Sequence, residues 1–146
     1  MIEKDELLEI PRLAKEVREE EARINSMREA LTSPKGFDNR ERVQSSGSQN
    51  SALVDVIIDL EHQLEEKADT LRLLERQAQK LFQAQGLRGE DNALMVMRYV
   101  EAYSWETIEQ LMHYGRATIF RRHNRIMAEI YGEQEQQKNE HGRAGE

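Results

Sequence analysis

A heptad repeat between Leu53 and Leu81 is the feature that most restricts what this chain can fold into. Nine positions follow one another at alternating steps of four and three residues, and eight of them are apolar. The repeat consists of Leu53, Ile57, Leu60, Leu64, Lys67, Leu71, Leu74, Ala78 and Leu81. This spacing places the apolar side chains on one face of a helix, as in a coiled coil or a long helix packed on another helix. Residues 52–86 therefore predict one helix of roughly 50 Å at about 1.5 Å per residue, with Lys67 as its one polar interruption.

A helix of this length needs a partner for its apolar face, because burial of that face supplies most of its stability. Residues 1–32 predict an amphipathic helix with an apolar stripe interrupted at Glu20. Pro11 fits the first turn of a helix, which leaves open that the regular helix begins at Ile10 and that the preceding residues form a separate turn. The stripe consists of Ile10, Leu13, Val17, Ile24, Met27 and Leu31. Residues 33–51 contain Pro, Gly and Ser without periodicity, which predicts a flexible linker. The partner is then the first helix folded back through this linker, a second copy of the chain, or both.

The composition agrees with an all-α fold of long N-terminal helices, as a coiled coil or helical hairpin, followed by a small three-helix domain. Charged residues make up 34% of the chain and aromatic residues 5%, which suits amphipathic helices better than a broad core. No apolar run approaches the length of a membrane span, and the N-terminus lacks a signal-peptide pattern. With no cysteine in the sequence, we expect a cytoplasmic protein with no membrane partner.

Residues 87–131 predict the three short helices, and residues 132–146 a disordered tail. Gly86 and Gly89 are expected to end the long helix, and Asp91 or Asn92 to cap the next one. The short helices are expected at 93–103, 105–112 and 117–131. Ser104 can cap the second of them, but the capping box is incomplete, because Thr107 stands where a full box has Glu or Gln.

The expected inner faces of these three helices repeat at helical spacing. The second helix contributes Ile108 and Leu111. The third contributes Ile119, Ile126, Met127 and Ile130, which are expected to pack on Leu94, Met97, Val100 and Ile108. This arrangement is a helix-turn-helix, in which the last helix can enter the major groove of DNA.

Charge is distributed unevenly in this acidic chain of net charge -7. Residues 88–131 hold six basic and six acidic residues, yet residues 112–128 hold four arginines and no acid. A local basic face matters more for nucleic-acid binding than the overall charge. Arg116, Ala117, Arg121, Asn124 and Arg125 are expected to project outward from the last helix. This pattern makes double-stranded DNA the expected partner.

The run R-Y-x-E-x-x-S-[YW]-E-x-I-x-x-L, from Arg98 to Leu111, followed by Thr118-Ile119, resembles the helix-turn-helix of the sigma-factor C-terminal region. Together with the preceding linker and the acidic long helix, residues 33–131 resemble ArpU-like and RinA-like transcriptional regulators of Gram-positive phages. The resemblance implies promoter binding, usually at late genes, in a bacterial host cell. It implies DNA-facing roles for Arg116, Ala117, Thr118, Arg121, Arg122 and Arg125, with Ser104 and Trp105 meeting the DNA backbone.

Two positions depart from the family, which often has glycine where this chain has Ala102 and His113. A left-handed turn conformation is inexpensive for glycine and costs about 1 kcal/mol for a residue with a Cβ atom. Gly115, two residues after His113, is positioned to cap the last helix.

Three functions fit these features, and catalysis is not among them. The chain has no Gly-rich phosphate loop and no nucleophile beside an identifiable base, and we expect no cofactor or metal. The leading hypothesis is a sequence-specific transcriptional regulator acting as a homo-oligomer, with a dimer favoured. The alternatives are a small-terminase-type DNA-packaging subunit forming a larger ring, and a coiled-coil adaptor without a DNA role. RNA polymerase is a further candidate partner.

Overall fold

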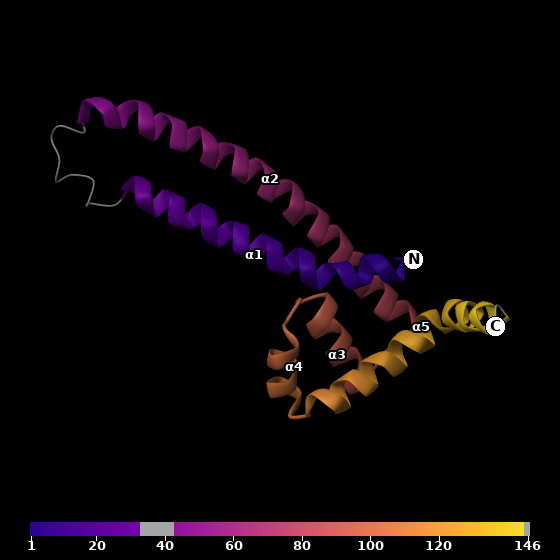
Figure 1. The fold of residues 1–146 in the computed structure, drawn as a ribbon. Helices are drawn as coiled ribbons and strands as arrows, with labels where there is room; N and C mark the ends of the chain where they lie inside the picture. Colours follow the sequence, from indigo (N-terminus) through magenta and orange to yellow (C-terminus); the bar gives the residue numbers. More distant parts are fainter. Residues whose placement is uncertain (33–42, 145–146) are drawn as a thin grey trace. The chain divides into compact units, whose positions relative to one another are not determined.

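The computed structural model describes the backbone of residues 1–32 and 43–144, and the side chains of residues 1–32 and 51–132. The described residues contain helices and no strand, which confirms the all-α prediction (Figure 1). The helices are α1 (Lys4–Thr32), α2 (Val43–Ala84), α3 (Gly89–Tyr99), α4 (Trp105–Met112) and α5 (Arg116–Ala144). Of the linker expected at 33–51, residues 33–42 lie outside the described residues, and α2 already begins at Val43.

The chain divides into two compact units. One unit is Arg12–Arg72, and the other combines Met1–Pro11 with Leu73–Glu146. The division crosses α1 beside Pro11, which lies inside the helix and has no N–H to donate to the carbonyl four residues earlier.

The Arg12–Arg72 unit is an antiparallel pair formed by α1 and α2 of the same chain (Figure 1). Its seam residues turn inward as the heptad pattern predicts: Ile24 and Ile57 are buried, and Leu60 and Leu64 are half-buried. The two polar interruptions meet, because the ammonium group of Lys67 donates to the carboxylate of Glu20. Each interruption therefore has its partner in the other helix.

A second contact confirms that the two helices run in opposite directions. Arg28 forms an ion pair with Glu61, so a step toward the end of α1 corresponds to a step toward the start of α2. The hydrogen bond that Lys67 donates to Glu20 raises the pKa of Lys67, so this lysine stays charged in the seam.

The other unit has its own core. It is built from the C-terminal helices together with the start of α1 and the end of α2. The largest fully buried side chains of this core are Leu7, Ile10, Phe82, Leu94, Met95, Tyr99, Ile108, Ile119 and Ile126. The rings of Phe82 and Tyr99 pack 6.3 Å apart, and the Tyr131 hydroxyl donates to the carbonyl of Ile2 at 3.0 Å. Residues 1–11 and 73–84 thus belong to the same compact body as the three short helices.

The α2–α3 connection follows the glycine signals only in part. Gly86 has φ +69°, and the N–H groups of Gly86 and Leu87 donate to the carbonyls of Gln83 and Phe82, a Schellman end for α2. The expected cap at Asp91 or Asn92 is wrong, because α3 already begins at Gly89. Asp91 lies in the first turn of α3 instead, with its carboxylate directed to α5.

The last helix continues past the end expected from the sequence. Its backbone is helical to Ala144, so it includes most of the segment 132–146 expected to be a disordered tail, of which residues 145–146 lie outside the described residues. In the described part of the chain, no helix combines the length and apolarity needed to cross a membrane.

Candidate nucleic-acid interface

The turn between α4 and α5 sets the position of the candidate interface. Ser104 caps α4 as expected, since its hydroxyl accepts from the Thr107 N–H at 3.2 Å. His113 ends α4 in the left-handed conformation, with φ 60° and ψ 36°. The carbonyl of Gly115 accepts from the Ile119 N–H at 3.1 Å, so Gly115 precedes the first residue of α5 as its cap.

The two positions where glycine was missing are both left-handed. Ala102, between α3 and α4, has φ 57°, and His113 has φ 60°. The chain therefore adopts the left-handed conformation at these two positions with residues that carry a Cβ atom. The resulting backbone strain, on the order of 1 kcal/mol at each position, is offset by the packing around the turn.

One face of α5 is buried and the opposite face is open. Ile119, Ile126 and Met127 pack inward as expected, whereas Ile130 is half-buried. Leu94 and Ile108 are also buried, and Met97 and Val100 half-buried. Leu111 was expected on the inner face of α4, but its side chain is 56% exposed. The half-buried Met112 takes the inward position in the last turn of α4 instead.

The outward face of α5 carries the residues that the sequence assigned to it. Arg116, Ala117, Arg121, Asn124 and Arg125 are exposed. Thr118, Arg121, Arg122 and Arg125 together line a shallow hollow of about 330 Å³. Three guanidinium groups around one open hollow can hold phosphate oxygens or the acceptor edge of a base.

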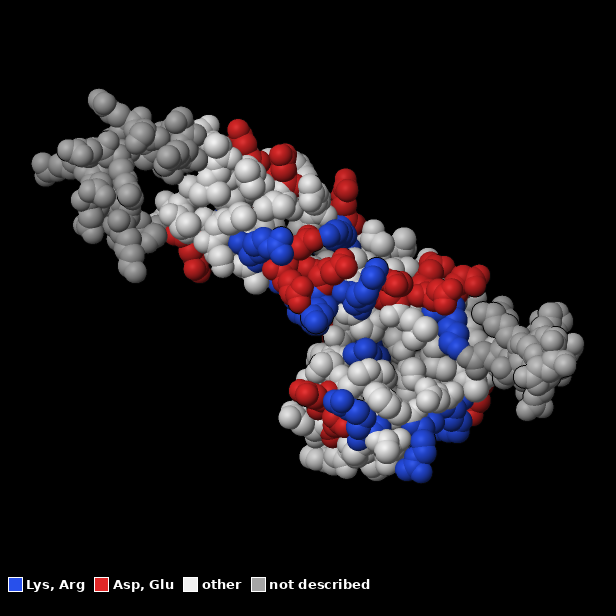
Figure 2. Space-filling model, viewed as in Figure 1, with Lys and Arg blue, Asp and Glu red and all other residues white. Residues whose placement is uncertain are grey.

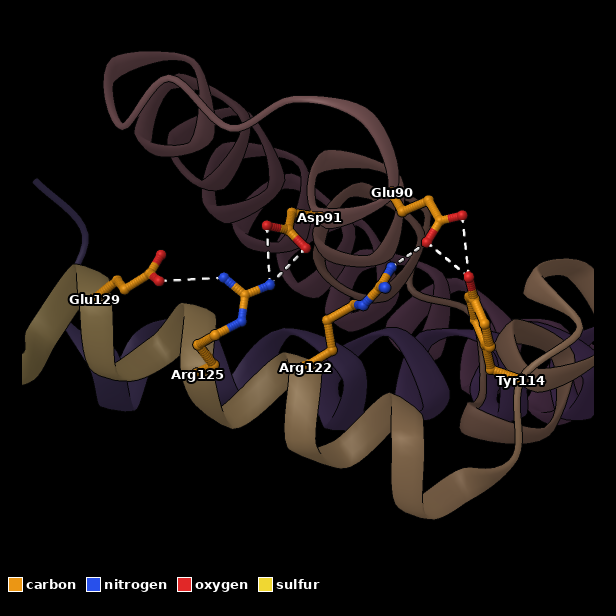
Figure 3. A network of polar contacts seen from close by, with 6 residues as sticks. All are labelled: Glu90, Asp91, Tyr114, Arg122, Arg125 and Glu129. Carbon is orange, nitrogen blue, oxygen red and sulfur yellow. Dashed lines mark hydrogen bonds and ion pairs between the residues drawn. The ribbon is translucent and has the colours of Figure 1, made fainter.

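The fold brings carboxylates to these arginines (Figure 3). Glu90 pairs with Arg122 and also accepts from the Tyr114 hydroxyl, at 3.0 Å to Oε2 and 3.2 Å to Oε1. One guanidinium nitrogen of Arg125 donates to both oxygens of Asp91, at 2.9 and 3.1 Å. A second nitrogen of Arg125 donates to Glu129 at 3.1 Å.

The arginines of the site therefore have acidic residues beside them in the fold, although the stretch of sequence that carries them has none. Arg116 also has an acidic partner, Glu109, at 3.4 Å. Arg121 differs from the other three, because the contact it makes among the described residues is with the hydroxyl of Thr118 at 3.4 Å. Basic side chains gather along α5 with acidic side chains beside them (Figure 2). This pairing was not predicted from the sequence, although the equal numbers of basic and acidic residues over residues 88–131 were consistent with it.

The ion pairs favour the charged form of each partner. The hydrogen bonds from Arg122 and Tyr114 lower the pKa of Glu90 below its usual range. The hydrogen bond that Arg125 donates to Asp91 raises the pKa of Arg125, and the one that Arg122 donates to Glu90 raises the pKa of Arg122. At neutral pH the α5 face thus presents fixed charges of both signs.

Ser104 and Trp105, expected to meet the DNA backbone, have contacts inside the unit. The Ser104 hydroxyl serves the α4 cap, and Trp105 is half-buried against the edges of Phe120 and His123, at 5.0 and 5.1 Å between ring centroids. The guanidinium of Arg98 lies over the indole, 4.2 Å from its centroid. These contacts fix the start of α4 against α5.

Arg98 is itself unusual. Its Nη1 donates to the Tyr103 carbonyl at 2.9 Å, and its Nε is buried without a hydrogen-bond partner among the described residues. Burial lowers the pKa of this arginine. Arg98 thus braces the loop between α3 and α4 with a partly desolvated charge.

A buried pair of polar side chains lies beneath the α5 face. The Tyr99 hydroxyl and Nε2 of His123 are 2.6 Å apart, and His123 is 8% exposed. Burial raises the pKa of Tyr99 to about 12 and lowers the pKa of His123. The other ring nitrogen of His123, Nδ1, lies 3.3 Å from the side-chain oxygen of Asn124, an acceptor. A neutral imidazole protonated on Nδ1 satisfies both contacts, because its Nε2 then accepts from the tyrosine hydroxyl.

Among the described residues, no three His, Asp or Glu side chains converge as they would around a metal ion. No protein-family model, no curated protein and no solved structure matches this chain. The interface is therefore interpreted from its own geometry.

Proposed function

We propose that this chain is a sequence-specific DNA-binding regulator in which α5 enters the major groove. The observation that carries the proposal is the hollow on the exposed face of α5, lined by Thr118, Arg121, Arg122 and Arg125. The α4–turn–α5 arrangement supports it, because a helix that follows such a turn can present its first turns to base edges. The first turn of α5 contains no acidic residue that would repel phosphate.

The arginines divide into two roles. Arg121 is the base-reading residue, because its guanidinium is held by a hydroxyl rather than a carboxylate and is free to form a bidentate contact with guanine. Arg122 and Arg125 are phosphate contacts on the flank toward α3, where their carboxylate partners lie. Ala117 and Thr118 complete the face that approaches the bases.

The motif from Arg98 to Leu111 supports placing this regulator among phage or prophage late-gene regulators. The Arg12–Arg72 helix pair then provides the oligomerisation element, with a dimer reading paired half-sites. A DNA-packaging subunit would instead form a larger ring, so the mass of the particle in solution separates the two functions.

The test is selection from a random duplex pool at about 0.15 M salt, a concentration at which phosphate contacts are already weakened, combined with a light-scattering mass. We expect a dimer that enriches one motif. Arg121→Ala should lose affinity and relax the motif, whereas Arg125→Ala should weaken all sequences equally. Arg76→Ala, an exposed arginine on α2, is the matched control and should keep the wild-type motif. A retained fraction without any motif would overturn the proposal.

A further inference from the structure

Glu90 and Asp91 connect α3 with the arginines of the candidate interface. Both lie in the first turn of α3, directly after Gly89, and both direct their carboxylates to arginines of α5. The two arginines they contact, Arg122 and Arg125, also line the hollow on the exposed face. The same guanidinium groups thus serve an internal carboxylate pair and an outward-facing anion site.

A carboxylate resembles a phosphate in charge and in the hydrogen bonds it accepts from arginine. Asp91 uses both oxygens on one nitrogen of Arg125, and Glu90 is held in place by the Tyr114 hydroxyl as well as by Arg122 (Figure 3). DNA phosphates that approach Arg122 and Arg125 must displace these carboxylates or lie beside them.

The pairs remain accessible to a competitor. Each pair has one side chain that is about half exposed, Arg125 at 50% and Glu90 at 56%, whereas their partners Asp91 and Arg122 are 29% and 27% exposed. Ion pairs in such exposed positions are weak, so a phosphate of the DNA can exchange with them. The acidic partners therefore oppose binding without preventing it.

We propose that Glu90 and Asp91 form an internal competitor for DNA phosphate that limits the sequence-independent affinity of the α5 face. This inference rests on the proposed DNA-binding function. Phosphate contacts carry no sequence information, so the limit applies equally to every duplex. Base reading by Arg121 is unaffected, because Arg121 has no carboxylate partner among the described residues.

The experiment compares wild type with Glu90→Gln/Asp91→Asn by fluorescence anisotropy, using a random duplex and a selected duplex. We expect affinity to rise roughly tenfold on both duplexes, with the salt slope steeper by up to about two because two phosphate contacts no longer need an exchange. The control Glu3→Gln/Glu101→Gln makes the same charge change in the same unit, at exposed carboxylates that are partners of neither Arg122 nor Arg125, and should change little.

Tyr114→Phe provides a second variant that keeps every charge. It removes the hydroxyl that holds Glu90 while preserving the ring beneath Arg122, 5.1 Å from the guanidinium, so an intermediate gain in affinity is expected. A merely structural role for the carboxylates would lower the melting temperature and leave the salt slope unchanged.

Each remaining outcome separates the two proposals. If wild type binds DNA at least as tightly as both variants, Glu90 and Asp91 do not compete with phosphate, and the proposed DNA binding still holds. An equal gain in the Glu3/Glu101 control would also overturn the competitor, since total charge would then explain the effect. Absence of duplex binding by every protein at about 0.05 M salt, where phosphate contacts are strong, would overturn both.

Discussion

His113 carries the least favourable backbone conformation of the candidate interface, and its cost can be measured. The residue has φ 60° and ψ 36°, and its side chain is exposed. Glycine adopts this conformation without the steric penalty, so we expect His113→Gly to raise the free energy of unfolding by about 0.5–1 kcal/mol. Chemical denaturation followed by the fluorescence of Trp105 measures the change.

His113→Ala is the matched variant, since it removes the imidazole and keeps the Cβ atom. It should give no stabilisation. If both variants raised the free energy of unfolding equally, the cause would be loss of the imidazole and not relief of the left-handed strain.

His123 makes the stability of its unit depend on pH. Its pKa in the folded chain is below the unfolded value of about 6.5, because the ring, carried by α5, is buried against Tyr99 and Trp105. The unfolded chain therefore takes up a proton that the folded chain does not. Stability is full above about pH 6.5 and falls as the pH decreases from there toward the lowered folded pKa.

Thermal melts at pH 7.5 and 5.5 measure this loss. His123→Gln should reduce the difference in melting temperature between the two pH values, at some cost in stability at both. His62→Gln replaces an exposed histidine of the other unit and should retain the full difference. Equal pH dependence in wild type and His123→Gln would exclude His123 as its source.

At the scale of elements, the α1–α2 pair shows which parts of a helix pattern can be predicted. The heptad repeat predicted the inward positions of α2, because apolar periodicity is a local property of the sequence. Glu20 and Lys67 could be recognised as interruptions of two stripes. Their pairing could not, since the two residues are 47 positions apart and only the antiparallel fold brings them together.

The Lys67–Glu20 pair predicts a rescue by charge exchange. Lys67→Glu places a second carboxylate against Glu20, near Glu16, and should lower the melting temperature of the helix pair. Exchanging both residues, as Lys67→Glu/Glu20→Lys, should restore most of the loss. Circular dichroism melts measure both effects.

Lys80→Glu makes the same charge change at an exposed position of α2 and should leave the melting temperature nearly unchanged. Failure of the exchanged pair to recover would mean that Lys67 and Glu20 do not meet in solution.

The short helices show the same division between local and distant signals. α4 was predicted with the bounds it has, Trp105–Met112, because its cap at Ser104 and its end at His113 are encoded locally. The contacts of Arg122 with Glu90 and of Arg125 with Asp91 span 32 and 34 positions. The sequence therefore indicated a basic stretch, whereas the fold places acidic side chains beside these arginines.

At the scale of the whole molecule, the chain's first residues complete the core of a domain that begins more than sixty residues later. Leu7 and Ile10 are fully buried, and Tyr131 donates to the carbonyl of Ile2. From the sequence, Pro11 indicated a possible start of the regular helix at Ile10, whereas α1 is continuous from Lys4 to Thr32. That residues 1–11 join a different core could not be predicted, because a helical pattern carries no sign of what its two ends pack against.

Leu7→Ala tests this assignment. Loss of a fully buried leucine should lower the free energy of unfolding by about 2–4 kcal/mol. The change should appear in the transition of Trp105, the one tryptophan of the chain, because Trp105 and Leu7 belong to the same unit. Leu8→Ala, at a neighbouring side chain that is 45% exposed, should stay within about 0.5 kcal/mol of wild type. A Trp105 transition unchanged by Leu7→Ala would separate the N-terminal residues from this core.

The central claim is that the exposed face of α5 binds duplex DNA, and the salt dependence of binding tests it most directly. Anisotropy of a labelled duplex should show affinity falling linearly on logarithmic scales between about 0.05 and 0.2 M salt, with a slope near −2 for the two phosphate contacts assigned to Arg122 and Arg125. Arg121→Ala/Arg122→Ala/Arg125→Ala should abolish binding, whereas Arg72→Ala/Arg76→Ala/Lys80→Ala, an equal loss of charge on α2, should preserve it. Binding that survives the α5 variant, or no binding by wild type at the lowest salt, would contradict the claim.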